Sequence, residues 1–245
     1  MPSQQADERP AEPELPDSEP AVLASGIKVR GPWGPVYGPI DLRIPTGGLN
    51  VLVCPAGPGR TALMMTLAGR MKPTSGELTV LGARRAKDIF ERSALAGVDE
   101  LDTVPESVTV ANLITEQLRW NARWYQLIPK ADQAALNRTC APVFGELPIP
   151  PLDEYFEALS ELDRLLLRIA LANIGRPPLL VVGSVENVTC DANRDLLFDR
   201  LIDIGREQTV VTATVNGAGS HPVRSQIAVP NTNRAELSDP RKGDG

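Results

Sequence analysis

A short glycine-rich segment holds the residues whose types and spacing best suit chemistry. It reads Cys54-Pro55-Ala56-Gly57-Pro58-Gly59-Arg60-Thr61 and follows an apolar run at residues 49–53. This order of a buried strand, a Gly-x-Gly turn and the start of a helix is typical of a phosphate-binding loop. In such a loop, the backbone N–H groups at the helix N-terminus face the anion. The pattern GxxxxGK(S/T) is broken twice, by Cys54 at the first glycine and by Arg60 at the lysine. Taken alone the loop is a weak signal, since a tight turn needs glycine for backbone reasons too.

The composition argues against several other chemistries. The 245 residues include one histidine, His221, and three cysteines, Cys54, Cys140 and Cys190, without a CxxC pair. With so few of these residues, the sequence argues against a His-based zinc site and against a disulfide framework. We therefore expect the cysteines to lie in the core, the histidine to lie in a loop, and the protein to be in a reducing cytoplasm. The net charge of -6 argues against a nucleic-acid partner. No run approaches the ~18 apolar residues of a membrane span.

The order of the elements that position the loop predicts an α/β fold. Strands alternating with helices indicate a largely parallel sheet, and we expect a helical subdomain inserted at about residues 103–158. Ser160 and Asp163 have capping-box spacing and should open a strongly apolar helix. The expected strands are residues 40–44, 49–53, 77–81, 179–182 and 209–214, and a helix is expected at residues 62–68.

Both ends of the chain have the composition of disordered tails. Residues 1–22 are acidic and rich in proline, and residues 231–245 are polar, so neither segment has enough apolar surface to bury. We therefore expect one folded domain at residues 23–230.

Several segments around the loop resemble the ATP-binding-cassette (ABC) ATPases, the nucleotide-binding domains of ABC transporters. In chain order they are residues 67–82 after the loop, 109–113 like TVxENL, 159–160 like the start of the LSGGQ signature, 176–182 like the Walker B strand and 209–214 like the strand before the switch histidine. The landmarks cover residues 27–216. The resemblance implies a P-loop NTPase (RecA-like) core with a mostly parallel sheet, an antiparallel β edge and an inserted helical subdomain.

The resemblance also implies where ATP and Mg²⁺ would bind. The implied nucleotide-binding residues are Ala56, Gly57, Pro58, Gly59, Arg60, Thr61, Ala62, Ser160 of the signature and Trp33 as the adenine-stacking aromatic. Tyr37 is the alternative stacking residue. The implied metal ligands are Thr61 and Glu100, which stands near the family's Q-loop position.

The family's catalytic positions depart from the pattern, so no catalytic residue is assigned. Gly183 and Ser184 stand where the Walker B aspartate and glutamate belong, and Val215 stands at the switch histidine. In the signature, Glu161 puts a negative charge where glycine normally approaches the γ-phosphate held by a partner. The D-loop aspartate aligns with Cys190 or Asp191, and Glu186 or Asp191 replaces the lost carboxylates only after a local shift of the chain.

Three functions fit these features. The first is an ATP-binding subunit with weak or absent hydrolysis, docked on a transmembrane permease and paired with a second nucleotide-binding domain as a homodimer or heterodimer. It would be cytoplasmic, at the inner face of the cell membrane. The second is a pseudo-ATPase, a structural or regulatory interaction protein that no longer binds nucleotide. The third, an ordinary working ABC ATPase, requires a different Walker B alignment.

Overall fold

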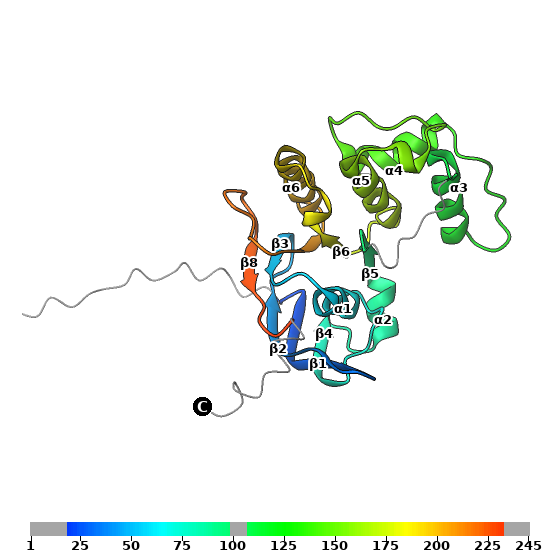
Figure 1. Cartoon of the computed structure of the whole chain (residues 1–245). Coiled ribbons are helices and arrows are strands. Elements are labelled where there is room, and N and C mark those ends of the chain that lie inside the picture. Colours follow the sequence, from blue (N-terminus) through cyan, green and yellow to red (C-terminus); the bar gives the residue numbers. More distant parts are fainter. Residues whose placement is uncertain (1–18, 99–106, 233–245) are drawn as a thin grey trace, which may run out of the picture.

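Two β-sheets and a set of helices make up the described part of the chain, residues 19–98 and 107–232 of a computed structural model (Figure 1). The smaller sheet is antiparallel, with the strand order β2-β1-β4. Its strands are β1 (Val22–Gly31), β2 (Gly34–Ile44) and β4 (Ser75–Val80). Buried and exposed residues alternate along much of β1 and β2, as expected where one face of a sheet packs on a core.

The larger sheet has five strands in the order β5-β6-β7-β3-β8, and every neighbouring pair is parallel. Its strands are β3 (Gly48–Val53), β5 (Ser93–Ala96), β6 (Leu179–Ser184), β7 (Thr209–Thr214) and β8 (Ser225–Ala228). All six residues of β7 are buried, which explains its continuous run of β-branched and small residues. The parallel sheet and the separate antiparallel sheet agree with the predicted α/β architecture.

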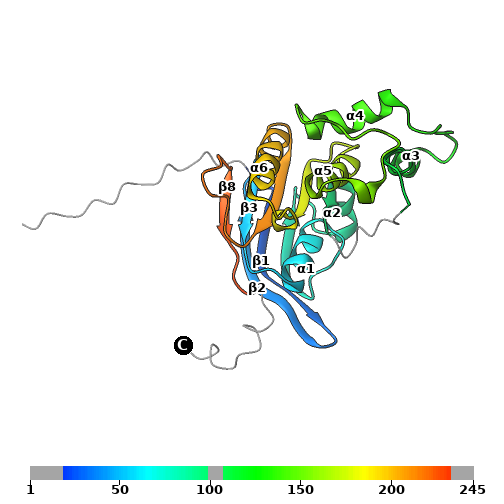
Figure 2. The same ribbon diagram turned by 45° about the horizontal axis from the view of Figure 1, so that its top comes forward.

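Helices cover both faces of the parallel sheet. Helix α1 (Pro58–Leu67) packs between the two sheets, where Leu63 and Met64 share a core with Ile40 of β2 and with Val181 of β6. Other helices share a second core with the parallel strands: α3 (Val110–Asn121), α4 (Gln133–Phe144), α5 (Glu161–Ala172) and α6 (Asp191–Gly205). In Figures 1 and 2, α3, α4 and α5 group together beside the β5 edge, and α2 (Ala86–Arg92) lies below them next to α1. None of the described helices is long and apolar enough to cross a membrane.

The predicted elements form, with small changes at their ends. Ser160 is the N-cap of α5, and its hydroxyl oxygen accepts a hydrogen bond from the Asp163 N–H at 3.1 Å, which confirms the predicted start of this helix. Helix α1 begins at Pro58, earlier than predicted, because proline is well accommodated in the first turn of a helix.

The folded domain is larger than residues 23–230, so the predicted tails were too long. Residue Val22 already pairs with Ile44 and Val80, and the Glu19 carbonyl accepts a hydrogen bond from Thr46 Oγ1 at 2.6 Å. At the other end Thr232 is buried. Composition could not predict that these short segments belong to the folded domain, because the residues that they pair with lie elsewhere in the chain. The rest of both predicted tails lies outside the described residues.

Candidate phosphate-binding site

The loop between β3 and α1 has the backbone of an anion site. Gly57 has a φ of 136°, a conformation that favours glycine, and no atom lies within 4 Å of the position that a Cβ would take. No side chain caps the N-terminus of α1, and its first turn contains no acidic residue. The N–H groups of this turn therefore present their positive end without competition from a nearby carboxylate on the same helix.

Gly59 allows close packing of the chain around the loop and does not leave space for a ligand. A Cβ at this position would lie 2.0 Å from the carbonyl oxygen of Thr232 and 2.7 Å from that of Val36. The segment after β8 and the strand β2 thus close against the first turn of α1. Of the two glycines, Gly57 lies on the open side of the loop and Gly59 on the packed side.

Arg60, the basic residue of the loop, is held by a carboxylate of its own chain. Its Nη1 lies 2.9 Å from Oε2 of Glu186, in the short 3-10 helix η2 (Val185–Asn187) that follows β6. The exposed fractions of the two side chains are 11% and 27%, so water screens the pair only in part. The other oxygen of Glu186 accepts a hydrogen bond from the N–H of Val215. One carboxylate therefore joins α1, the end of β6 and the segment after β7.

Gly183, the residue predicted to stand at the Walker B aspartate, is closely surrounded by backbone. A Cβ on Gly183 would lie 2.0 Å from the carbonyl oxygen of Gly97, just after β5. On the other side, the Gly183 carbonyl accepts a hydrogen bond from Thr212 Oγ1 at 2.9 Å. The two glycines let β5 and β6 continue side by side past the last paired residues, Ala96 and Val182. A carboxylate has no room at this point.

The signature segment is tied to its own chain. The Ser160 hydroxyl, besides capping α5, donates a hydrogen bond to Asp163 Oδ2 at 2.7 Å. Glu161 Oε2 accepts hydrogen bonds from the N–H of Thr189 at 2.9 Å and from its hydroxyl at 2.8 Å. These two bonds lower the pKa of Glu161. The carboxylate expected to face a partner's phosphate is thus bound to the segment that precedes α6.

Comparison with known proteins identifies the family of this chain, although no family model matches it. The chain is 31% identical over 204 residues to the cytochrome c biogenesis ATP-binding export protein CcmA of Cupriavidus pinatubonensis, covering 82% of this chain and 87% of that protein. This chain is an ABC transporter ATP-binding protein. The CcmA protein of Pseudomonas putida is 26% identical over 162 residues, which are 65% of this chain and 71% of that one.

Solved ABC structures share the fold and confirm its predicted class. A putative ABC transporter ATP-binding protein from Pyrococcus furiosus has a TM-score of 0.64 and 16% identity, covering 84% of this chain and 96% of its own. A bacterial ABC transporter cassette solved as a dimer has a TM-score of 0.64 and 15% identity, covering 80% and 88% of the two chains.

The two candidate adenine-stacking residues of this ABC protein lie in different surroundings. Trp33 is 83% exposed in the turn between β1 and β2, so it stays a prediction. Tyr37 is fully buried, and its hydroxyl donates to Thr66 Oγ1 at 2.9 Å. Burial raises the pKa of Tyr37 to about 12. The alternative of Tyr37 as the stacking residue is therefore wrong, because its ring belongs to the core.

Of the two predicted metal ligands, Thr61 and Glu100, the structure describes only Thr61. Thr61 lies half-buried in the first turn of α1, whereas Glu100 lies outside the described residues. Within residues 19–98 and 107–232, no group of three His, Cys, Asp or Glu side chains is arranged to hold a metal ion. Sequence reasoning missed Glu186 as a contact of Arg60, although it had named Glu186 as a substitute carboxylate.

The cysteines and the histidine mostly have the expected roles. Cys54, at the first glycine of the loop, is buried, and burial raises the pKa of its thiol to about 11. Cys140 is buried as well, but Cys190 is exposed at the N-terminus of α6, contrary to the expectation for a core cysteine. His221 stacks on Phe198 with 4.8 Å between ring centroids, which fits a structural loop histidine.

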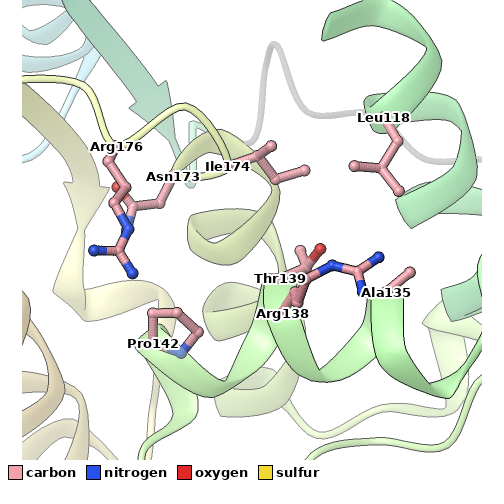
Figure 3. A pocket seen from close by; sticks show the side chains of 8 residues that line it. All are labelled: Leu118, Ala135, Arg138, Thr139, Pro142, Asn173, Ile174 and Arg176. Atoms are coloured by element: carbon pink, nitrogen blue, oxygen red, sulfur yellow. The ribbon is translucent and has the colours of Figure 1, made fainter. Parts of the chain in front are cut away.

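A separate pocket lies among the helices, away from the loop residues. It has a volume of about 220 Å³ and is lined by side chains of α4 and by the residues that follow α5. Figure 3 shows Arg138 and Thr139 of α4 across from Asn173 and Arg176. It shares no residue with the phosphate loop, so the loop remains the candidate nucleotide site.

Proposed function

We propose that this chain is the nucleotide-binding subunit of an ABC transporter and binds ATP with little or no hydrolysis. The observation that carries the proposal is the contrast between two neighbouring sites: the phosphate loop is open at Gly57, and the Walker B position is closed at Gly183. The family supplies the expected partners, a transmembrane permease and a second nucleotide-binding domain. These partners would place the chain at the cytoplasmic face of a membrane.

The residues of the loop fit the phosphates of ATP. N–H groups in the first turn of α1 can donate to phosphate oxygens at the positive end of the helix. Arg60 adds a charged donor once it is separated from Glu186, with a wider planar fork than the lysine of the family pattern. Thr61 adds a hydroxyl next to it. When bound, ATP supplies the phosphoanhydride bond whose hydrolysis drives transport, and the chain's own part is to bind and orient it.

The residues do not fit Mg²⁺ in the way the family binds it. Gly183 has no ligand atom in its side chain and no space for one, and Glu186 is already paired with Arg60. A nearby general base contributes typically about 10²–10⁴-fold to the rate. Glu186, the carboxylate that contacts the phosphate loop, already accepts hydrogen bonds from Arg60 and from the N–H of Val215. We therefore propose binding without efficient turnover.

A pseudo-ATPase that binds no nucleotide is the second candidate function. The Arg60–Glu186 pair favours it, because this pair neutralises the cation of the loop without any ligand. Isothermal titration calorimetry with ATP separates the two functions. Saturable binding that Arg60→Ala weakens sharply supports the first function, and the absence of heat in both the wild-type chain and Glu186→Gln supports the second. Turnover of the purified chain at ~1 s⁻¹ or faster, a rate typical of enzymes, would contradict both.

The partner is tested by isolating the chain from its native membranes with an affinity tag. We expect a polytopic membrane protein to co-purify in fixed ratio with the chain. Recovery of the chain only as a free monomer, under conditions that preserve other transporter complexes, would argue for the pseudo-ATPase.

A further inference from the structure

We propose that the resting phosphate site accepts a nucleoside diphosphate, and that a triphosphate enters only when Glu186 leaves Arg60. This inference rests on the proposed function, because it assumes that the loop binds nucleotide. It goes further by assigning to Glu186 the role of an internal anion that selects between two classes of nucleotide.

The first step is the position of the carboxylate. Glu186 uses one oxygen for Arg60 at 2.9 Å and the other for the Val215 N–H. Val215 follows directly after β7, at the family's switch position, and Arg60 stands at the position of the Walker A lysine. In phosphate loops the backbone holds the inner phosphates, and the basic residue reaches the β- and γ-phosphates. The Glu186 carboxylate thus occupies the corner where a terminal phosphate would meet both donors.

The second step is the space that remains. On the side of Gly57 the loop is open, since no atom lies within 4 Å of its Cβ position. The first turn of α1 has no acidic residue there to repel an anion. The N–H groups of this turn can hold the two inner phosphates while the Arg60–Glu186 pair stays closed, so the β-phosphate gives up only its contact with Arg60. A third phosphate depends on Arg60 and has to share it with Glu186.

The third step is charge. A γ-phosphate placed beside Glu186 brings like charges together in a partly shielded site, where water screens them less than at the surface. A second cation would relieve this repulsion, but the closed position at Gly183 removes the family's metal-binding carboxylate. The site therefore discriminates against the third phosphate through Glu186.

Calorimetry with ADP and ATP, each with Mg²⁺ and with EDTA, tests this assignment on the full-length chain. We expect the wild-type chain to bind ADP at least as tightly as ATP. Glu186→Gln keeps the size of the side chain and loses its charge. It should tighten ATP binding by roughly tenfold or more, the usual scale for a hydrogen bond to a charged group, and change ADP binding much less.

Two further variants accompany Glu186→Gln, one as a control at another glutamate and one as a smaller change at Glu186 itself. Glu207→Gln removes an exposed glutamate paired with Arg176 at 3.3 Å, and it should leave the ratio of the two affinities unchanged. Glu186→Asp withdraws the carboxylate by one methylene and should shift the ratio in the same direction as Glu186→Gln, but less. Circular dichroism confirms folding, and Glu186→Asp carries the test if Glu186→Gln does not fold.

The outcomes distinguish this inference from the proposed function. ATP binding much tighter than ADP binding in the wild-type chain, with the same ratio in Glu186→Gln, overturns the role of Glu186 and leaves the nucleotide-binding function standing. No binding of either nucleotide to any of the proteins overturns the proposed function itself. A ratio that shifts equally in Glu207→Gln shows a general charge effect and also overturns the inference.

Discussion

Arg60 and Glu186 form an ion pair of 2.9 Å that connects the phosphate loop to the segment after β6. The two residues are 126 positions apart in the chain, and the remaining oxygen of Glu186 reaches Val215. The positions predicted for the Walker A lysine and the switch histidine are therefore bridged by the chain itself. In the role proposed above, the carboxylate that pairs with the loop cation also blocks the side of the site where a third phosphate would bind.

Substitutions at Arg60 test whether the loop holds phosphate. Arg60→Ala should weaken ATP binding by roughly tenfold or more, because it removes a charge-assisted hydrogen bond and leaves Glu186 without its cation. Arg60→Lys should keep or tighten binding, since lysine restores the compact charge of the family pattern. Calorimetry measures all three proteins. Equal affinities would show that the loop does not hold phosphate.

The crowding at Gly183, the predicted Walker B position, predicts that ATP binding depends only weakly on magnesium. EDTA should change the affinity for ATP by less than about threefold, because Gly183 has no carboxylate to bind the ion and Mg²⁺ sites usually rely on one or two. Parallel titrations with and without Mg²⁺ measure this effect. A related ABC ATPase with both Walker B carboxylates is the control and should lose affinity. A large loss in this chain would mean that Glu100 or another carboxylate binds the ion.

The thiols should differ in reactivity. Burial raises the pKa of Cys54 to about 11 and that of Cys140 to about 12, so both are protonated and inaccessible at pH 8. Cys190 is exposed. Ellman's reagent should therefore titrate one thiol per native chain and three after unfolding in guanidinium. Cys190→Ser is the control, and it should lose the single native thiol.

The sequence predicted local structure better than it predicted contacts within the site. Apolar runs located β3, β6 and β7, and the spacing of Ser160 and Asp163 located the start of α5, because these features depend on neighbouring residues. The partner of Arg60 depends on where η2 turns after β6, which no local pattern encodes. The closure of Gly183 depends on Gly97, a residue of another strand's end. The sequence also could not decide the role of Tyr37, because an aromatic ring can either pack in a core or stack on a ligand.

The signature segment predicts a defined effect of pH on stability. Hydrogen bonds from Thr189 lower the pKa of Glu161 in the folded chain below its ordinary value of 4.5. A depressed carboxyl pKa stabilises the fold above the unfolded pKa, and this contribution is lost as the pH falls through the folded value. Glu161→Gln should therefore reduce the loss of unfolding free energy as the pH falls below 4.5. Urea titrations measure it, with Glu157→Gln as an exposed control that should behave like the wild type.

The contact between Gly183 and Gly97 predicts that an aspartate cannot simply be introduced at the predicted Walker B position. A Cβ on Gly183 would lie 2.0 Å from the Gly97 carbonyl oxygen, so any side chain forces the ends of β5 and β6 apart. Gly183→Ala should lower the free energy of unfolding by about 1–3 kcal/mol, the usual cost of overpacking, and Gly183→Asp by more, because it also buries a charge. Urea denaturation measures both. Gly175→Ala is the matched control, since no atom lies within 4 Å of its Cβ position, and it should leave stability nearly unchanged. A stable Gly183→Asp chain that gains Mg²⁺-dependent ATP binding would show that this position opens when nucleotide binds.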